Sequence, residues 1–356
     1  MKKFLAALLA TLMVFSLVAC GAKSADPVDE SKPVVSEEIS YPLTVTDMAG
    51  REVTLNAEPQ RIVSGYYISS SACIAMGLTD RMVGVEDKSD KRPVYKAAAP
   101  QLVDLPNVGS AKAFDMEACL AAEPDLVILP MKQKDTAAAL DEMGIPTLLV
   151  LPESHEQLIE MFTLIGKTTN SMEKADALIA YYNDKLAEVE SLTAKLTDAD
   201  KPVVMMGGTG NYLTTAPAQM YQASLIDAAG GINAGKDIEG NSWTEISYEQ
   251  LLTMNPAVIV IPTNNFATSA PDYTAEDVMN DAQLAELDAV KNGAVYQMTT
   301  GFEAWDSPVP SGILGTLWML KTLHPDLYSA DQFVKDAQDF YQTFYGFTPD
   351  AEALAG

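Results

Sequence analysis

The chain has few of the residues, and none of the motifs, on which most catalytic sites depend. It contains only two histidines, His155 and His324, and it lacks a Gly-x-Ser-x-Gly elbow, a phosphate loop ending in Gly-Lys and a His-Glu-x-x-His pair. The stretch Gly207-Gly-Thr-Gly210 has no lysine and is interpreted as a strand-to-loop turn. Two histidines so far apart do not supply a catalytic set or an all-histidine metal site. We therefore expect a protein that is not an enzyme and has no metal centre of its own.

The two histidines have simpler interpretations. His324 precedes Pro325 at the end of an apolar helix, where it is expected to cap the last turn. His155 comes just after a predicted strand, at the carboxyl end where open α/β sheets bind ligands. A ligand contact is therefore the lesser of the two possibilities kept open for His155, beside a structural role.

Positive charge is scarce. Lys and Arg number 23 against 49 Asp and Glu, which gives a formal net charge of −26. Arginine occurs only in the first third of the chain, at Arg51, Arg61, Arg81 and Arg92. A nucleic-acid-binding protein needs a basic surface, so this composition excludes that class. Strong acidity instead keeps a protein soluble beside an anionic membrane surface.

The N-terminus carries a short apolar run that does not reach the length of a membrane span. Residues 4–19 give about 16 mostly apolar positions after two lysines, and roughly 20 are needed to cross a bilayer. The ending Leu-Val-Ala-Cys20 resembles a bacterial lipoprotein box. We expect residues 1–19 to be a cleaved signal peptide and Cys20 to be the acylated mature N-terminus. An ordinary cleaved signal with an incidental cysteine is the alternative.

The segment after the expected anchor is small, polar and proline-bearing. Residues 20–40 are therefore predicted to be a lipid-anchored flexible stalk. Together with the signal, this places the protein outside the cell, anchored to the outer face of the cell membrane or in the periplasm. The remaining cysteines, Cys73 and Cys119, lie in apolar helical runs and are expected to be buried thiols, with a disulfide between them as the alternative.

The folded body alternates short apolar strands with helices. About 336 residues remain after cleavage, which exceeds a single typical core and suggests two domains. A β-hairpin is predicted over residues 43–55. Buried strands are predicted at 61–64, 82–85, 125–129, 146–151, 201–206, 257–261 and 294–298, and helices at 70–77, 117–122, 136–143 and 220–229. This alternation indicates an α/β fold with mainly parallel sheets.

A long helix is predicted in the middle of the chain. The stretch from Asn170 to Leu196 has no glycine or proline, has apolar residues at helical spacing, and opens with Asn-Ser-Met-Glu173, which resembles a capping box. Its central position suggests a rod between two lobes. The expected division is an N-terminal α/β lobe over 41–169, an interlobe helix over 170–197 and a C-terminal α/β lobe over 198–350.

The same local pattern occurs on both sides of this helix. Residues 116–128 and 248–260 each begin a two-turn helix with a glutamate, Glu117 or Glu249. Each then has a proline seven residues after the glutamate, Pro124 or Pro256, followed by a buried strand. Two copies with identical spacing predict two similar lobes.

Aromatic and small polar side chains gather in the loops that follow the predicted strands. Because these loops meet at the mouth of the cleft between two lobes, their residues are candidates for ligand contacts, with core packing as the alternative for each. The candidates are Tyr66, Tyr67, Tyr212, Trp243, Trp305, Asp306 and Ser307.

Several segments together identify a known family. Residues 45–55, 61–64, 75–85, 123–128 and 305–327 resemble the iron-complex and cobalamin substrate-binding proteins of ABC importers, and the likeness covers about residues 43–345. The resemblance implies two α/β lobes joined by one long rigid helix, with the ligand clamped between them. It implies no catalytic residues and no cofactor, and a membrane permease as partner. In this family a glutamate on each lobe docks onto permease arginines, and the matching positions are Glu117 and Glu249.

The resemblance leaves the ligand open. An iron complex, either a siderophore or haem, is the leading hypothesis, and Tyr66 or Tyr67 could ligate haem iron. The absence of arginine from the second lobe weighs against anionic ferric chelates. A corrinoid would use aromatic walls such as Trp243, and molybdate or tungstate would suit the segment 305–308. An enzyme of the same α/β architecture is the competing class.

Overall fold

The computed structural model describes residues 39–354 except 209, 263–272 and 299–301. The predictions of a signal peptide over 1–19, of lipidation at Cys20 and of almost the whole stalk concern residues outside this range. Across the described ranges, no helix combines the length and apolar character that a membrane span requires.

The first lobe is built on a four-stranded parallel sheet. Its strands follow the order β4-β3-β5-β6. They are β3 (Ile62–Ser64), β4 (Met82–Val85), β5 (Leu126–Pro130) and β6 (Thr147–Val150), and the helices of this lobe are α1 (Tyr67–Ala75), α2 (Pro93–Ala98), α3 (Met116–Ala121), α4 (Lys134–Glu142) and α5 (His155–Thr168). Short 3-10 turns occur at Thr79–Arg81, Ser89–Lys91, Pro100–Asp104 and Met131–Gln133. The strands are almost wholly buried, as expected for a parallel sheet with both faces covered.

The predicted hairpin forms at the side of this lobe. Strands β1 (Leu43–Thr46) and β2 (Glu52–Leu55) pair antiparallel. Asp47, in the turn, is buried and accepts two hydrogen bonds from the Arg51 guanidinium, one from the Arg51 amide and one from the backbone of Leu149 in β6. The hairpin is therefore tied to the edge strand of the sheet.

The second lobe repeats this architecture. Its sheet has the order β12-β11-β7-β9, and all neighbours are parallel. The strands are β7 (Val203–Met206), β9 (Ile232–Asn233), β11 (Val258–Pro262) and β12 (Val295–Met298), and the helices are α7 (Tyr221–Ala228), α8 (Tyr248–Met254), α9 (Ala275–Asn280) and α10 (Asp288–Lys291). The same lobe holds a small antiparallel pair, β8 (Thr214–Thr215) with β10 (Thr244–Glu245). Asn233 of β9 donates to the carbonyl of Ala216, the residue after β8.

The internal repeat predicted from the sequence is confirmed. Numbered by chain order within each lobe, both sheets run 2-1-3-4. The unit α3–β5 corresponds to α8–β11 down to the backbone, because the residue before each proline, Glu123 or Asn255, has a left-handed conformation with φ of 48° or 40°. A left-handed residue ends a helix, and a following proline prevents the helix from continuing.

The long helix is present but shorter than predicted. It is α6 (Met172–Thr193), and Ser171 is its N-cap without a side-chain hydrogen bond, so the predicted capping box over 170–173 is wrong. The reason is α5, which the sequence reading missed. That helix ends at Thr168, and Asn170, with φ of 54°, is the left-handed residue that terminates it.

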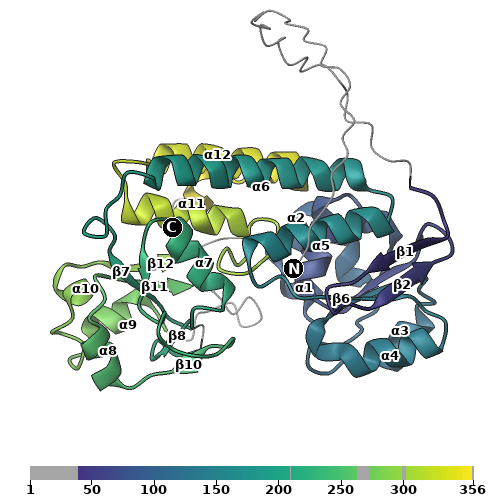
Figure 1. The fold of residues 1–356 in the computed structure, drawn as a ribbon, viewed down its shortest axis with the longest axis horizontal. Coiled ribbons are helices and arrows are strands. Elements are labelled where there is room, and N and C mark those ends of the chain that lie inside the picture. The colour runs from purple at the N-terminus through teal and green to yellow at the C-terminus, as the bar shows by residue number, and fades with distance from the viewer. Residues whose placement is uncertain (1–38, 209, 263–272, 299–301, 355–356) are drawn as a thin grey trace, which may run out of the picture. The chain divides into compact units, whose positions relative to one another are not determined.

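The C-terminal helices pack alongside α6 to form one helical layer. They are α11 (Gly312–Leu323), α12 (Ala330–Tyr345) and α13 (Ala351–Leu354), and α6, α11 and α12 run beside one another in Figure 1. The Tyr181 ring of α6 packs edge-on against Phe340 and Phe344, and Lys185 pairs with the buried Asp336. Helix α12 also contacts α1 of the first lobe, so the C-terminal helices add to the link that α6 makes between the lobes.

Candidate functional site

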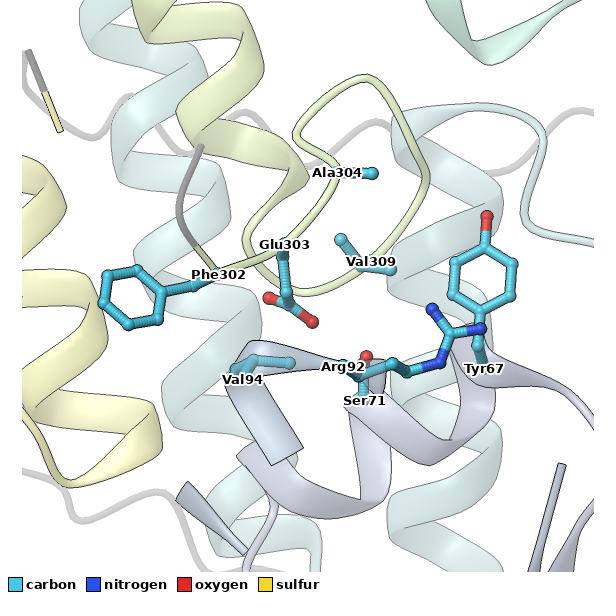
Figure 2. Close-up of a pocket in the computed structure, with 8 residues that line it drawn as sticks. All are labelled: Tyr67, Ser71, Arg92, Val94, Phe302, Glu303, Ala304 and Val309. Atoms are coloured by element: carbon cyan, nitrogen blue, oxygen red, sulfur yellow. The ribbon is translucent and has the colours of Figure 1, made fainter. Parts of the chain in front are cut away.

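A small hollow lies where the first lobe meets the loop after β12. A water-sized sphere can enter about 20 Å³ of it, and the space free of atoms is about 260 Å³ when the open solvent at its mouth is included. Helices α1 and α2 and the residues just before them form one wall, and the loop of residues 302–309 forms the other (Figure 2). The eight lining residues are Tyr67, Ser71, Arg92, Val94, Phe302, Glu303, Ala304 and Val309. This narrow hollow lies between the two lobes, where the sequence predicted a ligand cleft.

Arg92 provides the positive charge at this hollow. It is the N-cap of α2, and Figure 2 shows its guanidinium beside the Tyr67 ring, with its carbon 4.6 Å from the ring centroid. Its Nε donates to Glu86 at 3.0 Å, and Glu86 is buried and also accepts from Ser70 and Tyr95. Burial opposes the charge, but the neighbouring Tyr95 and Glu86 raise the pKa of Arg92, so the side chain remains a cation.

Glu303 places a carboxylate on the opposite wall. Its side chain is 4% exposed and accepts hydrogen bonds from Ser311 and Tyr345. Ser71 of α1 also bonds to it, which joins the first lobe to the loop after β12. Burial raises the pKa of Glu303, while these hydrogen bonds and the charge of Arg92 act in the opposite direction.

Two of the predicted ligand residues meet at this site. Tyr67 begins α1, lines the hollow and shares a side-chain hydrogen bond with Ser307 of the opposite wall. Tyr66 is half-buried, its ring lies edge-on to Tyr67 with centroids 5.4 Å apart, and burial raises its pKa. Asp306 is buried beside Ser307, its backbone carbonyl accepts from Gln222, and burial raises the pKa of its carboxyl to about 6.

Trp305 does not line the hollow, contrary to the prediction. Its side chain is 0% exposed and its indole Nε1 donates to the Tyr341 hydroxyl at 3.1 Å. The ring packs edge-on against Phe333 of α12. Because its one polar atom is paired and its surface is covered, Trp305 is a core residue of the C-terminal layer and offers no contact surface to a ligand.

Tyr212 and Trp243 belong to the second lobe's own loops. The Tyr212 hydroxyl donates to Asp281 and lies 3.1 Å from the Tyr248 hydroxyl, which also donates to Asp281. The half-buried Trp243 indole lies against the backbone of Gly208, where a Cβ would come within 3.3 Å of the ring. Neither residue is among the eight that line the hollow. The Gly208 amide bonds to Thr214 Oγ1, which agrees with the predicted strand-to-loop turn.

The two histidines occupy structural positions. His324 is the C-cap of α11 and its backbone amide donates to Leu320, as predicted. His155 starts α5 and is 6% exposed, with its ring 5.3 Å from that of Tyr221 on α7 and its Nε2 3.4 Å from Thr316 Oγ1 on α11. Burial lowers the pKa of His155 to about 4, so the imidazole is neutral at physiological pH.

The remaining predicted residues have clear positions. Glu117 and Glu249 are exposed in the first turns of α3 and α8. Cys73 and Cys119 are buried free thiols, as predicted, and burial raises their pKa values to about 12 and about 11. Within the part of the chain that the structure describes, no group of three or more His, Cys, Asp or Glu side chains could hold a metal ion.

Sequence reasoning missed Arg92, Ser71 and Glu303. Arg92 follows a short turn after β4, and a cation just before a proline that opens a helix was the available signal. Glu303 precedes the recognised segment 305–308 by only two residues. What the sequence did not show is that these three side chains face one another across two lobes.

A family model, curated relatives and solved structures all relate this chain to the same kind of protein. A model described as "Periplasmic binding protein" matches residues 62–300. The molybdate-binding protein MolA of Haemophilus influenzae is 26% identical over 340 residues, covering 87% of this chain and 93% of that protein. Its molybdate-bound structure superposes with a TM-score of 0.75 at 21% identity, covering 86% of this chain and 99% of the other.

Two further relatives carry names with different functional descriptions. An uncharacterised ABC transporter substrate-binding lipoprotein of Bacillus subtilis, YvrC, is 24% identical and covers 91% of this chain and 96% of its own. A cobalamin-binding protein of Halobacterium salinarum is 25% identical and covers 81% and 75%. The similarity thus covers three quarters or more of each of these relatives, and the two with a named ligand bind different ones.

Proposed function

Because the chain belongs to the periplasmic binding protein family, we propose that it captures an uncharged or cationic metal complex and delivers it to the permease of an ABC importer. That it is a substrate-binding protein of an ABC transporter, and not an enzyme, follows from the family and the relatives. An iron complex of the hydroxamate siderophore type is the leading ligand, and a corrinoid is the alternative with the same charge. The chain needs no cofactor of its own for this role.

The observation that carries the ligand class is the charge balance of the hollow. Among the eight described residues that line the hollow, Arg92 is the one cation, and it is matched by Glu86 on one side and faces Glu303 on the other. A negative charge in the hollow would lie beside the Glu303 carboxyl, whose pKa burial already raises, so an anion would gain no net attraction from Arg92. This weighs against ferric catecholates, against the propionates of haem and against oxyanions.

The aromatic side chains support the same class. Tyr66 and Tyr67 present a half-buried aromatic corner beside Ser307, and such corners suit ligands with extended apolar surface and a few polar groups. Pockets for drug-sized ligands span about 300–1,000 Å³, whereas a water-sized sphere can enter only about 20 Å³ of this hollow. A siderophore or corrinoid therefore fits only if the lobes separate.

A panel of ligands sorted by charge tests this proposal. Calorimetric titration of the purified mature chain uses a ferric hydroxamate, cobalamin, haem, a ferric catecholate and molybdate. We expect saturable binding, without turnover, by the ferric hydroxamate or by cobalamin, and none by molybdate. Binding of molybdate alone would contradict the ligand class but not the receptor role. A response to none of the five would sink both.

A second candidate, an oxyanion such as molybdate, is favoured by two observations. The hollow is compact. MolA, the first relative reported above, is a molybdate-binding protein, and its superposed structure has molybdate bound. The variant Glu303→Gln separates the candidates, because it removes a negative charge and keeps the shape. It should strengthen binding of an oxyanion by about 10-fold or more and leave binding of an uncharged complex within a few-fold.

The location and the partner complete the proposal. We propose that Cys20 carries a lipid that holds the receptor at the outer face of the cell membrane, in keeping with the lipoprotein YvrC among its relatives. We further propose that Glu117 and Glu249 dock onto cationic side chains of the permease. Both are exposed near helix N-termini, where they are free to meet a partner.

A further inference from the structure

An exposed leucine stands one turn after each of the two exposed glutamates. Leu120 follows Glu117 in α3, and Leu252 follows Glu249 in α8, each by three residues. Residues three apart on a helix are neighbours on its surface, so each helix presents a carboxylate beside an apolar side chain. The leucines are 37% and 40% exposed.

These leucines are unusual for this molecule. Across the residues that the structure describes, large apolar side chains are exposed at only five positions, and two of the five occupy the same place in the internal repeat. The other three, Met143, Tyr296 and Leu327, do not share a repeat position. The residue before each leucine, Cys119 or Leu251, is buried, so the exposure of the leucine is specific to its position on the helix.

The two helices are set in the same way by different residues. Asp115 caps α3 by accepting from the Ala118 amide, and Ser247 caps α8 by accepting from the Gln250 amide. Both helices lie on the side of their lobes away from α6 and α12 in Figure 1. Neither leucine is needed to hold its helix, because the caps and the buried neighbours already do so.

We propose that Leu120 and Leu252 are apolar contact residues of the permease-docking surface, each entering an apolar hollow beside the cation that meets Glu117 or Glu249. The inference rests on the proposed function. The partner that fits is one with two equivalent faces, because the receptor offers the same carboxylate–leucine pair twice, once on each lobe. Charge complementarity selects cations in that partner, and the leucines require an apolar surface next to each of them.

The division of labour between the two side chains follows from their chemistry. The exposed carboxylates set the orientation of the receptor and the rate of encounter, and their electrostatic attraction to the partner weakens as salt rises. The leucines remove apolar surface from water once docking is complete, so their contribution appears in the dissociation rate and persists at high salt.

The test uses the wild-type receptor and the purified importer of its own organism, reconstituted in lipid nanodiscs. Glutamine replaces leucine because it has similar length and helix propensity. Leu120→Gln and Leu252→Gln should each weaken docking about 10-fold, mainly by faster dissociation, and the weakening should remain at 0.5 M salt. Leu120→Met should dock like the wild type, because it keeps the apolar surface.

Matched controls separate docking from folding and from ligand capture. Met143→Gln and Leu327→Gln remove exposed apolar side chains outside α3 and α8, with Leu327 matched to Leu120 at 37% exposed and Met143 more exposed, and should leave docking unchanged. Melting temperature and ligand affinity should match the wild type in all leucine variants. Leucine variants that dock like the wild type while Glu117→Lys fails would overturn the inference and keep the receptor role. A wild-type chain that does not dock would instead refute the proposed function. A leucine variant that docks poorly only because it melts early would also overturn the inference.

Discussion

Stability near pH 5 should depend on His155 in a way that a single substitution reveals. The imidazole is 6% exposed between α5, α7 and α11, with the rings of Tyr182 and Tyr221 beside it. Burial lowers its pKa from 6.5 to about 4, a difference of about 2.5 pH units. At 1.36 kcal/mol per unit, the His155 contribution is about 3 kcal/mol.

The sign follows from which state binds the proton first. Below pH 6.5 the unfolded chain protonates this histidine while the native state does not, so stability falls as pH decreases from 6.5 to 4. Asp306 acts in the opposite direction, because burial raises its pKa to about 6 and the native state then holds the proton more tightly. The two effects largely cancel in the wild type, so the comparison must be made between variants.

The assay is urea unfolding of wild type and His155→Gln at several pH values from 7.5 to 4. The variant should have a lower free energy of unfolding at high pH because it loses packing contacts. The difference in this free energy between wild type and variant should shrink by about 3 kcal/mol from pH 7.5 to pH 4. His324→Gln is the control, since His324 is half-buried at a helix end. Nuclear magnetic resonance adds a direct reading, because the chain has only two histidines to assign. A stability difference that is independent of pH, or a His155 signal that titrates near 6.5, would refute the reasoning.

Three further predictions address the anchor, the core and the docking residues. Cys20→Ser should move the protein from membranes to the soluble fraction without changing ligand affinity, and continued membrane association would contradict lipidation. Trp305→Ala should lower the free energy of unfolding by about 3–5 kcal/mol, as for a buried aromatic side chain. Trp243→Ala should mainly destabilise its loop, and a ligand that contacts this ring would lose about 1–3 kcal/mol of binding free energy. Unfolding and ligand titration of both variants distinguish the two cases. Glu117→Lys with Glu249→Lys should abolish uptake and spare ligand affinity in the isolated receptor, and surviving uptake would refute docking through these carboxylates.

The sequence predicted the strands and the repeat well because their signals are local. Each predicted parallel strand is a short apolar run between a helix and a loop, and each forms with its ends within two residues of expectation. The two-residue strand β9, Ile232–Asn233, carries no such run and was not predicted. The repeat was visible because Glu123-Pro124 and Asn255-Pro256 impose the same backbone change, a left-handed residue followed by a proline.

Helix α5 was missed although its signal was present. Ser154 caps it by accepting from the Gln157 amide, and its apolar residues Leu158, Phe162 and Ile165 recur at helical spacing. The expectation for this segment rests on His155 alone, which does not reveal the helix. The capping box expected over 170–173 does not form because Asn170, with its left-handed φ of 54°, ends α5 rather than beginning α6.

The site was only partly predictable for a physical reason. A position after a strand tells which edge of the sheet a residue reaches, but not which way its side chain points. Tyr67 and Ser307 meet across the hollow, whereas Trp305, two residues before Ser307, turns into the core toward Tyr341 and Phe333. The pairing of Arg92 with a buried carboxylate depends on contacts between distant segments, which spacing along one sequence does not encode.

We propose that ligand enters the hollow between α1, α2 and the loop of residues 302–309, and a titration of two Ala304 variants tests this proposal. Ala304 lines this hollow, so Ala304→Phe fills the space while Ala304→Ser keeps it open. Calorimetry with the best ligand of the panel should show binding lost in Ala304→Phe and retained in Ala304→Ser, with both variants melting close to the wild type. Wild-type affinity in a folded Ala304→Phe protein would contradict the claim.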